Sequence, residues 1–149
     1  MSRGKLSRRM ATAAAVAAAG LALAGVATSP AAAAGGKVQG WKVSTSPYRC
    51  TGDVCLYYSP GAEGAIWAKT SFTDYNLSDN RFWSDQYGSA GSGQSVNDNA
   101  ASQENNTAYT LYTYTGANMT GSVAWTPAWY GGNLGAVGMR NTVSSYEVR

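Results

Sequence analysis

The sequence of 149 residues contains no histidine and only two cysteines. Without an imidazole, Ser-His-Asp and Cys-His catalysis are excluded, as is any zinc site that needs a histidine ligand. Two cysteines are also too few for a metal site built from four thiolates. Because so much familiar enzyme chemistry is absent, we expect a binding protein rather than an enzyme.

Charged residues are also scarce, and they are unevenly placed. They make up 13% of the chain, whose formal net charge is +3. Four basic residues lie in residues 1–34, whereas no acidic residue precedes Asp53. Residues 35–149 carry seven basic and eight acidic residues, a net charge of −1. This balance, without a basic cluster, argues against nucleic acid as a partner.

Residues 1–34 have the three-part layout of a secretory signal. A basic stretch over residues 1–10 precedes an apolar run over residues 11–27, and small residues follow up to Ala34. The run is mostly alanine and shorter than the roughly 20 residues of a membrane span, so we favour a cleaved signal over an anchor. The pair Arg8-Arg9 is also typical of twin-arginine export, which leaves the route open. We expect a secreted, extracellular monomer without membrane contact after cleavage.

Cys50 and Cys55 are separated by four residues, among which Gly52 and Asp53 favour a turn. In an exported protein, two nearby cysteines most simply pair with each other. Closing so short a loop stabilises a fold by about 2 kcal/mol in the chain-entropy model. The alternative is a redox or metal-binding pair, but redox pairs usually have two intervening residues. We therefore expect a disulfide at the start of the domain.

The remaining chain has the pattern of an all-β protein. Short segments rich in aromatic and β-branched residues alternate with Gly, Asn, Ser and Pro, and no window shows a stripe with a 3.6-residue period. The expected strands lie at residues 56–58, 65–68, 109–112, 122–125 and 144–148.

These segments also repeat. An offset of 57 in the numbering puts Gly64 on Gly121 and Leu77 on Leu134, while an offset of 43 puts positions 97–102 on 140–145. Ahead of these positions, Leu56-Tyr57 matches Leu111-Tyr112 with a two-residue slip. Two copies of one unit, each unable to bury its apolar face alone, imply two packed sheets.

The repeat defines the expected domain organisation. We expect a flexible leader at residues 35–47 and one domain at residues 48–149, with repeat one at about 50–104 and repeat two at about 105–149. The extra residues of the first copy lie near residues 83–96, a Gly- and Ser-rich stretch that is typical of an exposed loop. The role of this loop stays open, although its composition favours mobility.

Three features together resemble bacterial secreted βγ-crystallin-like proteins. They are Cys50-x4-Cys55-Leu56-Tyr57, the paired aromatic strands, and Asn97-Asp98-x-x-Ala101-Ser102 at the end of a copy. The chain is similar in particular to the peptidase inhibitors of family thirty-six, which includes inhibitors of metalloproteinases. The resemblance covers about residues 48–149. It implies a sandwich of two Greek-key motifs with one disulfide, and an extracellular protease as partner. No residue matches a reactive bond, so the inhibitory reactive site is unknown from the sequence.

The same resemblance implies a calcium site. Many βγ-crystallin domains bind calcium through two Asn/Asp residues, two free positions, Ser/Thr and Ser. Here Ala101 replaces a hydroxyl in the first copy and Arg140 an acidic or amide residue in the second. If the loops exchange ligands, as in the family, Asn97, Asp98 and Ser144 form one composite site. Alternatively, these side chains only hold a turn. Calcium is thus a candidate cofactor, and no other is required.

Three other functions compete with inhibition. A carbohydrate-binding module would use a platform of tryptophans, for which the candidates are Trp67, Trp83, Trp125 and Trp129. Phe72 and Trp129 occupy equivalent positions in the two repeats, as do Tyr57 and Tyr112, and this favours core or corner roles for them. Trp41 and Trp83 lie outside the matched positions and are better candidates for exposure. A glycosidase needs two carboxylates across a cleft, and no spacing selects a pair among Asp74, Asp79, Asp85, Asp98 and Glu104. An antimicrobial or toxin-like protein on the same fold is the third.

Overall fold

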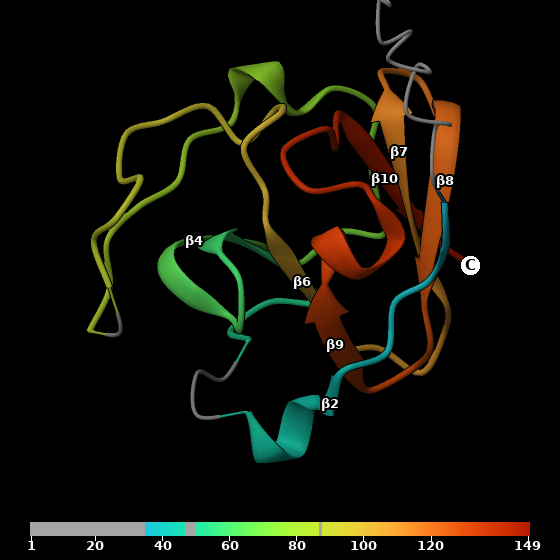
Figure 1. Cartoon of the computed structure of the whole chain (residues 1–149), viewed down its shortest axis with the longest axis horizontal. Coiled ribbons are helices and arrows are strands. Elements are labelled where there is room, and N and C mark those ends of the chain that lie inside the picture. The colour runs from blue at the N-terminus through green and yellow to red at the C-terminus, as the bar shows by residue number, and fades with distance from the viewer. Residues whose placement is uncertain (1–34, 47–49, 87) are drawn as a thin grey trace, which may run out of the picture.

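The computed structural model describes residues 35–46, 50–86 and 88–149, so the expected signal lies outside the described residues. In these described residues, ten strands form two five-stranded sheets, whose arrangement Figure 1 shows. Sheet A has the order β1-β8-β7-β10-β5 and sheet B the order β2-β9-β6-β3-β4. The strands are β1 (Gly36–Lys37), β2 (Trp41–Lys42), β3 (Val54–Ser59), β4 (Glu63–Lys69), β5 (Thr73–Asp74), β6 (Ser102–Asn105), β7 (Leu111–Gly116), β8 (Thr120–Thr126), β9 (Tyr130–Asn133) and β10 (Ser145–Val148). Three short 3-10 helices are η1 (Val43–Thr45), η2 (Leu77–Asp79) and η3 (Leu134–Val137).

The two repeats exchange their third strands. In repeat one, β3, β4 and β6 lie in sheet B while β5 joins sheet A. In repeat two, β7, β8 and β10 lie in sheet A while β9 joins sheet B. Each sheet is therefore completed by the other repeat, which confirms the expected sandwich of two Greek-key motifs.

The repeat offset of 57 holds through both hairpins, from Val54 and Leu111 at the first strand to Lys69 and Thr126 at the end of the second. Tyr57 is thus equivalent to Tyr114, and the two-residue slip expected from the sequence is wrong. The register is set by the backbone, because both hairpins carry a register shift at the same place, after Tyr57 and after Tyr114. The matching Leu-Tyr pairs that indicated a slip are a coincidence of composition.

Gly64 and Gly121 occupy the one strand position where the hairpin demands a glycine. Their φ angles are 76° and 81°, in the left-handed region that other residues rarely adopt. A serine closes each hairpin loop next to them. Ser102 Oγ donates to the Ser59 carbonyl at 2.7 Å, and Ser145 Oγ donates to the Gly116 carbonyl at 2.7 Å. The terminal serine of each repeated loop therefore has a structural role.

The segment expected as a flexible leader is instead a pair of edge strands. β1 pairs in parallel with β8 at the edge of sheet A, and β2 pairs antiparallel with β9 at the edge of sheet B. In Figure 1 this cyan segment runs beside β8 and then crosses to β9. Sheet edges carry unpaired backbone groups that a passing chain can satisfy, and Val38 between the two strands is 1% exposed. Residue 47, the expected end of the leader, is outside the described residues.

The hydrophobic core has two parts. The larger cluster fills the space between the sheets, and its largest members include Leu56, Phe82, Leu111 and Tyr146. A smaller cluster lies on the outer face of sheet B, where Val43 and Cys50 pack with Cys55, Tyr57, Ala62 and Ile66. Trp41, which we expected to be exposed, is half-buried against this second cluster. Among the described residues, no helix is long and apolar enough to cross a membrane.

The Gly- and Ser-rich insertion lies along the free edge of β4. Ile66 and Trp83 exchange backbone hydrogen bonds of 3.0 Å and 2.9 Å, and the Ala65 amide donates to the Ala90 carbonyl at 2.8 Å. These bonds tie the insertion to the sheet, whereas its composition favours mobility. Trp83 is 42% exposed, as expected. The insertion covers the edge of β4 as β1 covers the equivalent edge of β8.

Candidate functional site

Four loops meet at one end of the sandwich, which we call the disulfide end. They are residues 50–53, 70–72, 106–110 and 127–129. Cys50 and Cys55 form the expected disulfide, with their Cα atoms 5.6 Å apart. The disulfide fixes the start of β3 beside the second hydrophobic cluster.

A buried asparagine holds the loop at residues 106–110. Asn105 is fully buried, and its Nδ2 donates to the carbonyls of Tyr109, Thr126 and Pro127 at 2.7, 3.1 and 3.0 Å. Its Oδ1 accepts from the amide and the hydroxyl of Thr107 at 3.2 and 2.7 Å. Because one side chain satisfies both the start and the end of the loop, the loop backbone is fixed without a disulfide.

This braced loop presents Tyr109, which is 55% exposed. Its ring lies against Phe72 in an edge-to-face contact with ring centroids 5.6 Å apart. The chain after it is also tied down, since Thr110 and Arg149 exchange two backbone hydrogen bonds of 3.0 Å. The loop therefore offers a rigid backbone with an exposed aromatic residue.

The braced loop and the disulfide loop are joined to each other. The Asn106 amide donates to the Asp53 carbonyl at 2.8 Å, and its Nδ2 donates to the Gly52 carbonyl at 3.1 Å. A cavity of about 500 Å³ opens beside them, lined by Val43, Ser44, Cys50, Asn106 and Trp129.

Trp129 adds a third exposed aromatic residue to the disulfide end. It is 52% exposed and has a φ of 64°, a strained value for a residue other than glycine. Phe72, its repeat equivalent, is 44% exposed, so both occupy corners rather than the core. Exposed aromatic side chains on rigid loops are typical anchors of protein–protein interfaces.

The residues expected for calcium do come together at the other end of the sandwich. Ser144 Oγ donates to Asp98 Oδ1 at 3.2 Å, and Asn97 Nδ2 donates to Asp98 Oδ2 at 2.7 Å. The amide, carboxylate and hydroxyl oxygens are the ligand types that calcium prefers, so the residues fit the ion in kind. No group of three or more Asp, Glu, Cys or His side chains suited to a metal occurs in the part of the chain that the structure describes.

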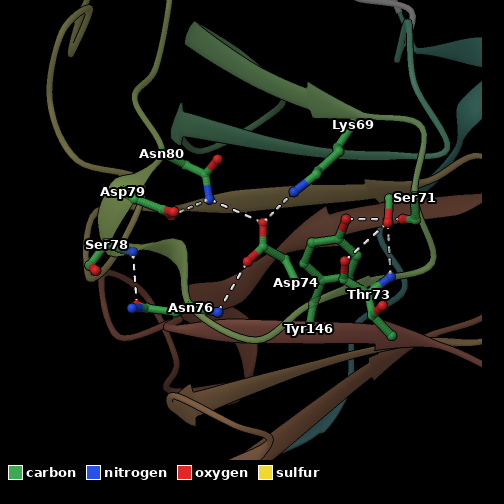
Figure 2. Close-up of polar contacts among 9 residues, drawn as sticks. All are labelled: Lys69, Ser71, Thr73, Asp74, Asn76, Ser78, Asp79, Asn80 and Tyr146. Carbon is green, nitrogen blue, oxygen red and sulfur yellow. Dashed lines mark hydrogen bonds and ion pairs between the residues drawn. The ribbon is translucent and has the colours of Figure 1, made fainter.

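Two of the carboxylates considered for hydrolysis, Asp74 and Asp79, are engaged in structural contacts. Asp74 accepts hydrogen bonds from Lys69 Nζ, the Asn76 amide and Asn80 Nδ2, and Asp79 accepts from the same Asn80 amide (Figure 2). The Lys69–Asp74 ion pair measures 2.8 Å. Below them Tyr146 donates to the Ser71 carbonyl at 3.0 Å, and burial raises the pKa of its phenol above the ordinary value. This cluster ties the β4–β5 corner to β10.

Glu104 is fully buried on the outer side of sheet B. Its Oε1 accepts from Trp41 Nε1 at 2.6 Å and its Oε2 from the Tyr57 hydroxyl at 2.7 Å. Burial, followed by the charge of Glu104, raises the pKa of Tyr57 above its ordinary value. The tyrosine stays protonated and serves as a donor. Glu104 thus anchors the N-terminal strands rather than facing a cleft.

The four tryptophans considered for a carbohydrate platform do not form one surface. Trp67 is only 4% exposed and packs on Tyr146 in the core. Trp83 lies in the insertion and Trp129 at the disulfide end, whereas Trp125 lies on the outer face of sheet A.

The sequence analysis did not identify Asn105 and Thr107 as residues that brace a loop. The repeat alignment could have pointed to Thr107, which falls on Cys50 at the same offset of 57, but it gives no such signal for Asn105.

The fold has relatives among solved structures. One, described as "Evolution of the eye lens beta-gamma-crystallin domain fold", matches with a TM-score of 0.52 and 14% identity over 64% of this chain and 83% of its own. A βγ-crystallin domain from Flavobacterium johnsoniae matches with a TM-score of 0.46 and 19% identity, over 65% of this chain and 93% of its own. At such identity the first likeness shows the fold alone.

The sequence comparisons give the family. No curated protein matches the chain. The model of peptidase inhibitor family I36 matches residues 43–126, more than half of the chain, and this segment contains the disulfide, the insertion and the braced loop. The chain therefore belongs to peptidase inhibitor family I36.

Proposed function

We propose that this protein is secreted and inhibits an extracellular peptidase, with a metalloproteinase as the expected class. The observation that supports this most is the buried Asn105 side chain, which bonds three carbonyls and thereby fixes the loop at residues 106–110. An inhibitor loop must be held in the conformation that the enzyme cleft binds, because ordering a mobile loop on binding costs affinity. The braced loop meets this requirement. The insertion at residues 83–96 instead makes backbone hydrogen bonds along the edge of β4.

Tyr109 is the residue of this loop that would enter the enzyme. Its side chain is exposed, and Phe72 supports it from the side. An aromatic ring carries a large apolar area at a low entropy cost, so it suits a peptidase pocket that prefers large apolar side chains. The role requires binding and no catalytic group of this chain.

The test is an inhibition assay with the purified protein against secreted metallopeptidases and serine peptidases that prefer large apolar residues. We expect inhibition of at least one enzyme and a loss of at least tenfold in potency for Tyr109→Ala. Tyr75→Ala is the matched control, because Tyr75 is 61% exposed at the opposite end of the sandwich. Absence of inhibition across the panel would contradict the proposal, and so would equal potency of the two variants.

Asn105→Ala tests whether the brace matters. This change leaves three carbonyls without their donor, so the loop becomes mobile and the inhibition constant rises even where the fold persists. Wild-type potency of a folded Asn105→Ala protein would show that another surface binds the enzyme.

Calcium binding is a second candidate function, favoured by the contact between Asp98 and Ser144 from different repeats. A ligand that binds only the folded state must raise the melting temperature. We expect calcium to raise it for the wild type and not for Asp98→Ala, with Asp79→Ala as a control that keeps the rise. No calcium-dependent rise in the wild type would retire this candidate.

A further inference from the structure

The outer face of sheet A carries a row of five register partners that crosses all five of its strands. In order they are Lys37 on β1, Trp125 on β8, Tyr112 on β7, Glu147 on β10 and Thr73 on β5. Neighbouring strands lie about 4.8 Å apart, so the row is roughly 19 Å long. The inhibitory loop proposed above does not use this row.

The row faces solvent because the alternate positions on the same strands face the core. Ala124, Thr113 and Tyr146 are all fully buried, whereas Trp125 and Val123 are each 37% exposed. On sheet B the equivalent outer face is covered by the second hydrophobic cluster. An uncovered outer face with an exposed indole on its second strand is therefore a feature of sheet A.

Cations lie on both sides of Trp125. Lys37 Nζ is 5.6 Å from the centroid of the Trp125 ring, and the Arg149 guanidinium is 4.5 Å from the centroid of the Tyr112 ring next to it. Glu147 holds Arg149 in place with a contact of 2.8 Å and also accepts from the Tyr114 hydroxyl at 2.6 Å. The Trp125 indole thus lies next to Tyr112 and its Arg149 cation, and two cations stand against one carboxylate.

We propose that this row binds an extended acidic polysaccharide. A sugar ring stacks its C–H face on an indole, while its carboxylates bind cations on either side, and guanidinium matches a carboxylate in two hydrogen bonds. The row crosses five neighbouring strands, which gives an extended sugar chain a length of roughly 19 Å to lie along. Because Arg149 is already fixed by Glu147 and Tyr112, little conformational entropy is lost on binding.

The test is affinity electrophoresis of the purified protein in gels that contain polygalacturonate, with hydroxyethyl cellulose as the neutral control. We expect retardation by polygalacturonate that salt weakens, and at least a tenfold weaker affinity for Trp125→Ala. Trp83→Ala is the matched control, since Trp83 is similarly exposed at 42% but lies in the insertion. Lys37→Gln should weaken binding less than Trp125→Ala.

Trp125→Phe guards against loss of folding, because it keeps a stacking ring and should retain most of the affinity. No retardation of the wild type would overturn the proposal. So would equal retardation by both polymers, or unchanged retardation of a folded Trp125→Ala protein. These results leave the peptidase assay unaffected, because Tyr109 lies in a loop outside the row.

Discussion

The two outer sheet faces carry the same tyrosine–glutamate pair in different surroundings. On sheet B the Tyr57 hydroxyl donates to Glu104 at 2.7 Å, and on sheet A the Tyr114 hydroxyl donates to Glu147 at 2.6 Å. The repeat places Tyr57 on Tyr114 and Glu104 on Glu147. Glu104 is fully buried, but the Glu147 side chain is 20% exposed.

The difference comes from the chain outside the repeats. On sheet B the N-terminal strands add Trp41, whose Nε1 donates to Glu104 at 2.6 Å, and η1 packs beside it. On sheet A the second partner of the glutamate is Arg149, which is itself 62% exposed. On sheet B the repeated tyrosine–glutamate pair therefore binds another segment of the same chain, the N-terminal strands. On the other face its glutamate is partly exposed and pairs with a surface arginine.

Glu104→Ala should have the largest effect on stability. It leaves the buried Tyr57 hydroxyl and the Trp41 indole without their acceptor and creates a cavity, so the free energy of unfolding should fall by about 3 kcal/mol. Glu147→Ala, the repeat-equivalent change, should cost less than about 1 kcal/mol because Glu147 is itself partly exposed and its partner Arg149 is 62% exposed. Urea unfolding of both variants measures the difference, and equal losses would contradict the distinction between the two faces.

Replacing both Cys50 and Cys55 by serine should have the second largest effect. The loop closed by the disulfide is short, so the expected loss is about 2 kcal/mol in the chain-entropy model. Trp41 fluorescence should also change, because Cys50 and Cys55 belong to the cluster against which Trp41 packs. A wild-type midpoint in urea for the double variant would show that the N-terminal strands alone hold this face.

The sequence predicts the repeated part of the fold well and the N-terminal strands poorly. The repeat appears in the sequence because each copy needs the same glycine, the same loop serine and the same buried leucine, here Leu77 and Leu134. β1 and β2 have two residues each, too few for any periodicity to show. They are held by backbone bonds to sheet edges and by the bond from Trp41 to Glu104, whose partners are 63 residues apart, so neither contact leaves a short-range pattern in the sequence.

Some candidate site residues could likewise be predicted from the sequence, and others could not. The disulfide could be predicted because its chemistry is a property of residue type and short spacing. Calcium binding stays a prediction that comes from the family resemblance. Asn105 could not be predicted, because its carbonyl partners in Thr126 and Pro127 are 21 and 22 residues away and any residue supplies a carbonyl. Tyr109 looks like part of a strand in the sequence, and only the bonds around it show a loop.

The two sheets also differ on their inner faces, where sheet B has the apolar Leu56 and sheet A has the polar Thr113. Thr113→Val should make the two faces more alike. Thr113 is the repeat equivalent of Leu56, and its hydroxyl is buried with no hydrogen-bond partner among the described residues. An unpaired buried hydroxyl costs stability, so valine should raise the free energy of unfolding by about 1 kcal/mol. Thr126→Val is the control, since the Thr126 hydroxyl accepts from Gln103 at 2.7 Å and its loss should destabilise. Thermal unfolding compares the two, and destabilisation by Thr113→Val would mean that a bound water satisfies the hydroxyl.

The smallest effect at neutral pH is expected for Tyr114→Phe, and it should alter the response to alkali. Burial, with a further contribution from the hydrogen bond to Glu147, raises the pKa of Tyr114 to about 12, whereas an unfolded tyrosine titrates near about 10. The protonated phenol is thus favoured in the folded state. Its contribution to stability is complete below pH about 10 and is lost as the pH rises toward about 12.

Urea unfolding at several alkaline pH values should therefore show that the free energy of unfolding falls less with pH for Tyr114→Phe than for the wild type. Parallel pH dependences would mean that the phenol on the open face is as accessible to hydroxide as in the unfolded chain.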